Sequence, residues 1–140
     1  MKRLTATITA VAIALAVIAL PIVTASASGV PCGNGGSRAQ NKAMVVCLSK
    51  QAGLQVSAAE AVKVGNCESG FYAKAHNPAG PYDGIFQLLP AEFKVFPHQG
   101  PAWMKAEFKQ YHYSVFSARG NALAALAHAH TYGWGAWSCA

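Results

Sequence analysis

Acidic residues are scarce in this chain of 140 residues, which has five carboxylate side chains against 11 lysines and arginines. A catalytic carboxylate, if there is one, must therefore be one of these five side chains. The basic residues form no run, and this disfavours nucleic-acid binding, which needs clustered lysine and arginine to neutralise phosphates. Mild basicity instead favours an acidic partner, such as a bacterial wall polymer. The five acids are Glu60, Glu68, Asp83, Glu92 and Glu107.

Long apolar runs are also lacking, except for one near the amino terminus that is short for a membrane span of about 20 residues. Two basic residues precede this run at 8–20, Pro21 interrupts it, and small residues follow at 25–27. This order is typical of a secretory signal peptide. We predict that residues 1–27 are removed, leaving 113 residues with nine basic and five acidic side chains, a net charge of +4. The mature protein is then expected to be secreted and extracellular, with no membrane attachment.

Cysteine pairs with metal-site or redox spacing are absent. An even number of cysteines in a small exported domain predicts disulfides, and four cysteines allow three pairings. His128 and His130 lie two residues apart, so on a helix they point to different faces and do not share a metal ion. We therefore predict no metal and no organic cofactor. The four cysteines are Cys32, Cys47, Cys67 and Cys139.

Apolar periodicity and turn residues predict a mainly helical, single small domain, in which a lead-in and first helix (28–56) fold together with the region 57–140. Ser57 and Glu60 match a capping box, which gives Glu60 a structural role. The prolines and glycines between 76 and 84 are expected to prevent regular structure there. Helices are expected over about 38–52 with Gly53 as its cap, 57–70, 90–94, 102–111 and 121–132.

Glu68 is the acid whose setting most needs an explanation. On a helix it shares a face with Val64 and Phe71, so that a lone carboxylate lies on an apolar stripe. Apolar neighbours disfavour the ionised form of a carboxyl and raise its pKa, and such a group can donate a proton near neutral pH. The local pattern fits equally well a glutamate at a helix end in water.

Three separated motifs occur in order in the second half of the chain, followed by a tryptophan-rich end. Together with Asn77 and Tyr82 they resemble the catalytic domain of the actinobacterial resuscitation-promoting factors, within the soluble lytic transglycosylase and goose-type lysozyme superfamily. The resemblance covers about residues 59–139 and implies a lysozyme-like α+β fold with little strand. The segments are Cys-Glu-Ser-Gly at 67–70, Gly-Ile-Phe-Gln at 84–87, an alanine-rich helix led by Asn at 121–127, and Gly-Trp-Gly-Ala-Trp-Ser-Cys at 133–139.

The resemblance implies that Glu68 is the catalytic acid of an enzyme that cleaves the β-1,4 bond between N-acetylmuramic acid and N-acetylglucosamine in peptidoglycan. In lytic transglycosylases the same glutamate then acts as a base, and the 6-hydroxyl of the muramic acid attacks to give a 1,6-anhydro end. The resemblance also implies a Cys67–Cys139 disulfide, and with it Cys32–Cys47. We expect a monomer that acts on glycan strands at the cell wall, and the sequence identifies no partner enzyme.

Hydrolysis would favour a second carboxylate, and Asp83, 15 residues after Glu68, is the nearest candidate. Goose-type lysozymes carry an aspartate at a similar distance, whereas the promoting factors tend to have a tyrosine. A muramidase assisted by Asp83 is therefore an alternative, although an aspartate before Gly84 fits a turn residue equally well. A non-catalytic module that binds wall glycan is another. A membrane-active antimicrobial protein is disfavoured, because no mature segment predicts a strongly cationic amphipathic helix.

Polar and aromatic side chains are expected to form the glycan groove. Gln87 is an amide in an apolar run and is a candidate to hydrogen-bond an N-acetyl group. We expect Asn121 to cap its helix or to bond within the core. For the tryptophans, burial in the core is as good an interpretation as stacking on sugars. The remaining candidates for contact with the glycan are Asn77, Tyr82, Tyr132, Trp134 and Trp137.

Overall fold

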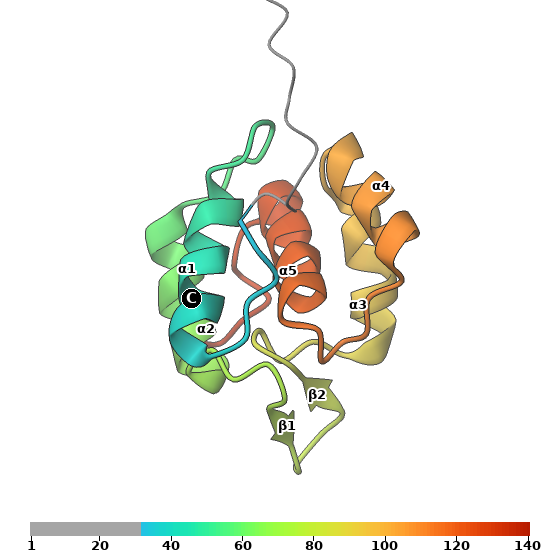
Figure 1. The fold of residues 1–140 in the computed structure, drawn as a ribbon. Coiled ribbons are helices and arrows are strands. Elements are labelled where there is room, and N and C mark those ends of the chain that lie inside the picture. Colours follow the sequence, from blue (N-terminus) through green and yellow to red (C-terminus); the bar gives the residue numbers. More distant parts are fainter. Residues whose placement is uncertain (1–31) are drawn as a thin grey trace, which may run out of the picture.

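The computed structural model describes residues 32–140, a small and mainly helical domain with two disulfides, as the sequence predicts (Figure 1). The predicted signal peptide (1–27) and residues 28–31 lie outside the described residues. None of the helices in the described part has the length and apolar character that a membrane crossing requires. The elements are α1 (Arg38–Ser49), α2 (Ala58–Ser69), β1 (His76–Asn77), β2 (Tyr82–Asp83), α3 (Pro90–Val95), the 3-10 helix η1 (Phe96–Gln99), α4 (Ala102–Tyr111) and α5 (Ala118–Tyr132).

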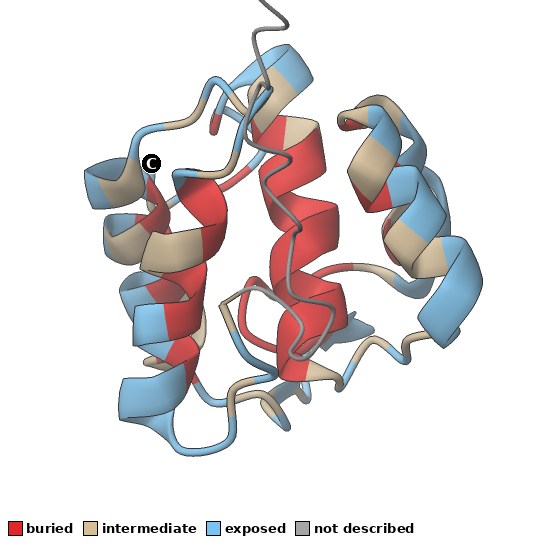
Figure 2. Ribbon diagram, turned by 45° about the horizontal axis from the view of Figure 1, so that its top comes forward, coloured by how far each residue is buried: buried red, intermediate tan, exposed pale blue. Residues whose placement is uncertain are grey.

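Helix α5 is the centre of the domain and is buried along most of its length (Figure 2). Figure 1 shows α1 and α2 on one side of it, and α3 and α4 on the other. A helix whose buried residues lie all round it must be covered on every side. Its alanines let the neighbouring elements approach closely, while Leu123 and Leu126 fill the space between them. The helix begins three residues before the predicted start, because the Ser117 hydroxyl accepts a hydrogen bond from Gly120 N and caps it.

The ends of the first two helices follow their capping residues. Helix α1 ends at Ser49, earlier than the predicted residue 52, and Gly53 lies beyond it in the following turn. Helix α2 begins after Ser57, whose hydroxyl accepts from Glu60 N at 3.3 Å, and ends at Gly70 in the left-handed conformation. Within residues 32–140 the Glu60 carboxylate makes no return bond, so only half of the predicted capping box forms.

A short antiparallel hairpin forms where the sequence predicted no regular structure, and that expectation is wrong. His76 pairs with Asp83 and Asn77 with Tyr82. The two prolines of this segment lie in the loop between the strands, so neither removes a hydrogen bond from the paired residues. The Asp83 backbone also exchanges two hydrogen bonds with Leu88, at 3.0 and 2.9 Å. The hairpin is thereby tied to the loop that follows it.

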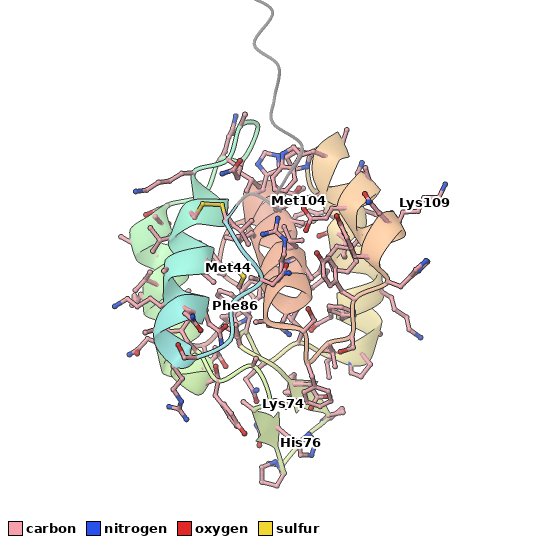
Figure 3. All side chains as sticks on the ribbon, in the orientation of Figure 1. Met44, Lys74, His76, Phe86, Met104 and Lys109 are labelled. Carbon is pink, nitrogen blue, oxygen red and sulfur yellow. A yellow bond between two sulfur atoms is a disulfide. The ribbon has the colours of Figure 1, made fainter. Side chains whose placement is uncertain are left out.

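The buried side chain of Asn121 holds this loop against α5. Its Oδ1 accepts from Phe86 N at 2.8 Å, and its Nδ2 donates to the carbonyls of Asp83 and Val115, both at 3.0 Å. Gly84 is required beside it, because a Cβ there would lie 2.3 Å from Asn121 Nδ2, and its φ is +79°. Figure 3 shows Phe86 in the interior and His76 out on the hairpin. The expectation that Asn121 bonds within the core is thus met.

Both disulfides have the pairing that the resemblance implied. Cys32–Cys47 ties the segment before α1 to that helix, and Cys67–Cys139 ties the last turn of α2 to the end of the chain. The second closes a loop of 72 residues, against 15 for the first. The loop-entropy model gives about 4 kcal/mol of stabilisation for the longer loop and about 3 kcal/mol for the shorter.

Replacement of Asn121 by alanine is predicted to lower the free energy of unfolding by about 3 kcal/mol, because it leaves the Phe86 N–H and the Val115 carbonyl without partners and removes one of the two hydrogen bonds to the Asp83 carbonyl. Urea denaturation of the variant and the wild type measures the difference. Asn66→Ala, at an exposed position of α2, is the control and should change stability by about 0.5 kcal/mol or less. A loss below about 1 kcal/mol in Asn121→Ala would contradict the role assigned to this amide.

Removal of the disulfides one at a time is predicted to rank them by loop length. The double variant Cys67→Ser, Cys139→Ser should lose about 4 kcal/mol, and Cys32→Ser, Cys47→Ser about 3 kcal/mol. Denaturant unfolding of both variants under identical conditions gives the comparison. The reverse order would mean that native packing around the bridges, rather than restriction of the unfolded chain, sets their contribution.

Candidate functional site

A cleft of about 320 Å³ opens where the end of α2, the hairpin, α3 with η1, and the carboxyl-terminal segment meet. Ligand pockets in proteins commonly have volumes of about 300 to 1,000 Å³, so this cleft falls at the lower end of that range. It brings together residues that are far apart in the sequence. Five of the residues predicted to act or to bind line it, namely Glu68, Asn77, Tyr82, Gln87 and Trp137.

Glu68 is held on both sides by its neighbours. Cys67 is bonded to Cys139, and the Ser69 hydroxyl donates to the Ile85 carbonyl at 2.8 Å. The carboxyl between them is partly buried, and burial raises the pKa of Glu68 above its ordinary value of 4.5. The direction of this shift is the expected one, although α2 ends at Ser69 and Phe71 does not continue its apolar face. Glu68 is therefore a rigidly placed carboxyl that retains its proton to higher pH than a glutamate in water.

Gln87 lies in a backbone conformation that side chains with a Cβ seldom adopt, with φ of +49°. Its Nε2 donates to the Gly84 carbonyl at 2.9 Å, and its Oε1 has no partner within residues 32–140. Such strain persists only where the surrounding structure enforces it, as the Asn121 bonds do here. The loop therefore presents a fixed amide oxygen to the cleft, suited to accept a hydrogen bond from an N–H group.

Asn77 and Tyr82 face the cleft as a cross-strand pair of the hairpin. Asn77 Oδ1 accepts from Ala79 N at 3.0 Å, which fixes the amide and leaves its nitrogen available. The ring of Tyr82 is 40% exposed and can cover a ligand from the solvent side. The short hairpin thus supplies one amide and one aromatic ring to the same wall.

Asp83 is not brought into the cleft, although the sequence made it a candidate second carboxylate. It follows Tyr82 in β2, and successive side chains of a strand point to opposite faces. Its carboxylate is buried, and Oδ1 lies 2.7 Å from Nδ1 of His76. The aspartate therefore faces a histidine across the hairpin, and this pairing also replaces the turn role that the sequence allowed.

Two of the aromatic residues predicted to contact the glycan also lie outside the cleft. Tyr132, at the end of α5, is 66% exposed and does not line the cleft. Trp134 is 7% exposed and stacks on Phe86, with ring centroids 5.6 Å apart. Trp137 packs against both rings and donates from Nε1 to the Phe86 carbonyl at 2.8 Å. Of the candidate tryptophans, Trp137 is the one that lines the cleft.

Sequence reasoning missed the contribution of α3 and η1 to the cleft. Glu92 and Phe96 line it, together with Ala136 and Ser138 from the carboxyl-terminal segment. An acid in the first turn of a helix has a sufficient local explanation, since negative charge is favourable there. No local pattern indicates that the start of α3 lies across from α2. Ala136 and Ser138 belong to the motif at 133–139, and that motif was the signal in the sequence that could have identified them.

Within residues 32–140 no three His, Cys, Asp or Glu side chains group so as to hold a metal ion. Comparison of the chain with protein-family models, with curated proteins and with solved structures found no match.

Substitution of Glu68 by glutamine is predicted to stabilise the fold at pH 7. Because burial raises the pKa of Glu68, the folded state binds this proton more tightly than the unfolded state does. The stabilisation is complete below the unfolded value of 4.5 and is lost as pH rises through the folded pKa. Glutamine mimics the protonated form at every pH.

Thermal unfolding of the wild type and Glu68→Gln at pH 4 and pH 7 tests this prediction. The variant should melt higher at pH 7, and the difference should shrink at pH 4. Glu60→Gln, an exposed substitution of the same kind, gives the effect of the chemical change alone. A wild type more stable than Glu68→Gln at pH 7 would contradict the prediction.

Proposed function

We propose that this protein cleaves the glycan strands of peptidoglycan between N-acetylmuramic acid and N-acetylglucosamine, as a lytic transglycosylase with Glu68 as its catalytic acid. The observation that carries the proposal is the partly buried Glu68 carboxyl, with its raised pKa, in a cleft lined by amides and aromatic rings. The resemblance of three ordered motifs to resuscitation-promoting factors and lytic transglycosylases supports it. A proton donor beside hydrogen-bonding and stacking groups is what glycosidic cleavage requires.

In the proposed reaction Glu68 gives its proton to the oxygen that links the two sugars. The bond from this oxygen to C1 of the muramic acid breaks, and an oxocarbenium-like carbon forms. The ionised Glu68 then takes the proton of the muramic acid's 6-hydroxyl, whose oxygen bonds to C1. The products are a 1,6-anhydro end and a free 4-hydroxyl, and Glu68 regains its proton.

The cleft residues have separate roles in this proposal. Gln87 Oε1 accepts from the N–H of an N-acetyl group, and the Asn77 amide donates to a sugar or acetyl oxygen. Phe96 and Trp137 provide apolar surface for a sugar face. Their rings are held by core contacts, Trp137 against Phe86 and Phe96 against His128, so little freedom is lost on binding.

The proposed setting is outside the cell at the bacterial wall. The signal-like first 27 residues and the two disulfides support it, since disulfides persist in oxidising compartments. The net positive charge favours association with an acidic wall polymer. No partner other than the glycan strand enters the proposal.

Mass spectrometry of fragments released from purified peptidoglycan tests the proposal. The wild type is expected to release fragments with anhydro-muramic ends, and Glu68→Gln to release about 100-fold less or none, because amide cannot donate the proton. Circular dichroism and thermal unfolding of the variant verify that it is folded.

Other outcomes of this experiment would support other functions. Reducing muramic ends would mean hydrolysis instead of transglycosylation. Saturable binding to the wall with no fragments from either protein would mean a non-catalytic binding module. Full activity of a folded Glu68→Gln protein would contradict the assignment of the acid.

A further inference from the structure

A second carboxylate, that of Glu92, lines the same cleft as Glu68. Glu92 belongs to the first turn of α3, whereas Glu68 belongs to the last turn of α2. Figure 1 shows these two helices on opposite sides of α5. The two carboxyl groups therefore reach the cleft from different elements on different sides of the central helix.

Glu92 uses one of its two oxygens to hold its own position. Oε2 accepts from the Leu89 N–H at 2.9 Å, and Oε1 has no hydrogen-bond partner within the described part of the chain. This hydrogen bond fixes the Glu92 carboxylate at the start of α3. One acceptor oxygen remains available for a ligand in the cleft.

Glu68 and Glu92 line one cleft from different helices, and within residues 32–140 no hydrogen bond joins their carboxyl groups. Burial is the cause of the raised pKa of Glu68. Two carboxylates that share one position would repel each other and raise one pKa strongly. Glycosidases place two acids on either side of the scissile bond, about 5 to 9.5 Å apart, and two acids that line one cleft from different helices suit such an arrangement.

The wall behind Glu92 is apolar and aromatic. Phe96 lines the cleft and stacks on His128, with ring centroids 4.1 Å apart, and His128 Nδ1 lies 3.0 Å from Gln99 Oε1. Burial lowers the pKa of His128, and the charge of Glu92 acts in the opposite direction. Glu92 therefore lies near a partly buried aromatic cluster, and a charge at such a boundary is less screened than one in water.

We propose that Glu92 is the second catalytic carboxylate of the cleft and stabilises the positive charge that develops on the sugar carbon. The inference rests on the proposed glycan cleavage. As the C1–oxygen bond breaks, its electron pair leaves with the oxygen that receives the Glu68 proton. The electron-poor C1 is stabilised by the negative Glu92 without forming a bond to it. Whether the 6-hydroxyl or a water then attacks, this role is the same, and Asp83 is paired with His76 and does not supply it.

Replacement of Glu92 by glutamine removes the charge and keeps an oxygen that can accept from Leu89 N–H. Glu60→Gln is a matched control, because Glu60 and Glu92 both occupy the third position of their helices and Glu60 is exposed and outside the cleft. On purified peptidoglycan we expect Glu92→Gln to lower kcat about 100-fold with KM within about 3-fold, as for loss of a group that acts in the transition state. Glu60→Gln should match the wild type.

The outcomes separate the two proposals. An active wild type, an inactive Glu68→Gln and a fully active Glu92→Gln would overturn the role of Glu92 and leave that of Glu68 standing. A Glu92→Gln protein with raised KM and normal kcat would also overturn it, because Glu92 would then contribute to ground-state binding alone. A wild type that releases no fragments would overturn glycan cleavage and this inference together.

A second pair of variants covers the case in which Glu92→Gln does not fold. Glu92→Asp and Glu92→Asn are equal in size and shorten the side chain equally, so they differ in charge. Their thermal unfolding is compared first, and their kcat values next. The proposal requires the aspartate variant to be at least about 10-fold faster. Equal rates in the two folded variants would overturn it.

Discussion

The buried amide of Asn121 is the interaction on which the site depends. Its three hydrogen bonds join α5 to the backbone on both sides of Gly84 and to the segment before the helix. The loop that they hold carries Gln87 and follows the hairpin with Asn77 and Tyr82. A polar group with no exposure in an apolar core is costly unless fully bonded, so the loop has one position in which every partner is satisfied. The geometry of one wall of the cleft follows from that requirement.

The opposite wall is fixed by covalent and aromatic contacts. The Cys67–Cys139 bridge joins the residue before Glu68 to the end of the chain, and the Trp137 indole donates to the Phe86 carbonyl. Phe86 thus accepts from Trp137 and donates to Asn121 through its own backbone, and its ring packs against both tryptophans, which also contact each other. The two walls share this residue. A substitution that moves Phe86 would therefore displace the glutamate side and the amide side of the cleft together.

Local signals in the sequence located the five α-helices, although not all of their ends, and did not reveal the hairpin. Caps such as Ser57 and Gly70 act within a few residues of the helix ends that they define, so the pattern predicted those ends well. Strand pairing depends on where the chain returns, and prolines near 76–84 suggested irregular structure when they in fact lie in the loop. The same limit applies to Asp83. Its neighbour Tyr82 lines the cleft as predicted. Because successive side chains of a strand point to opposite faces, Asp83 points away from the cleft, and the sequence did not reveal this strand.

The sequence identified Glu68 as an acid of the cleft and overlooked Glu92. A comparison of Glu92 with Glu60 shows why. Both stand at the third position of a helix, where a carboxylate has a structural reason to be, and such a reason is easily taken as complete. A local hydrogen bond occupies one oxygen of a carboxylate and leaves the second oxygen and the charge available. Whether this second oxygen and this charge can act on a ligand depends on which elements face the carboxylate. For Glu92 those elements are set by the packing of α3 against α5. A sufficient local role therefore does not exclude a role in the cleft, and tertiary placement is what distinguishes the two glutamates.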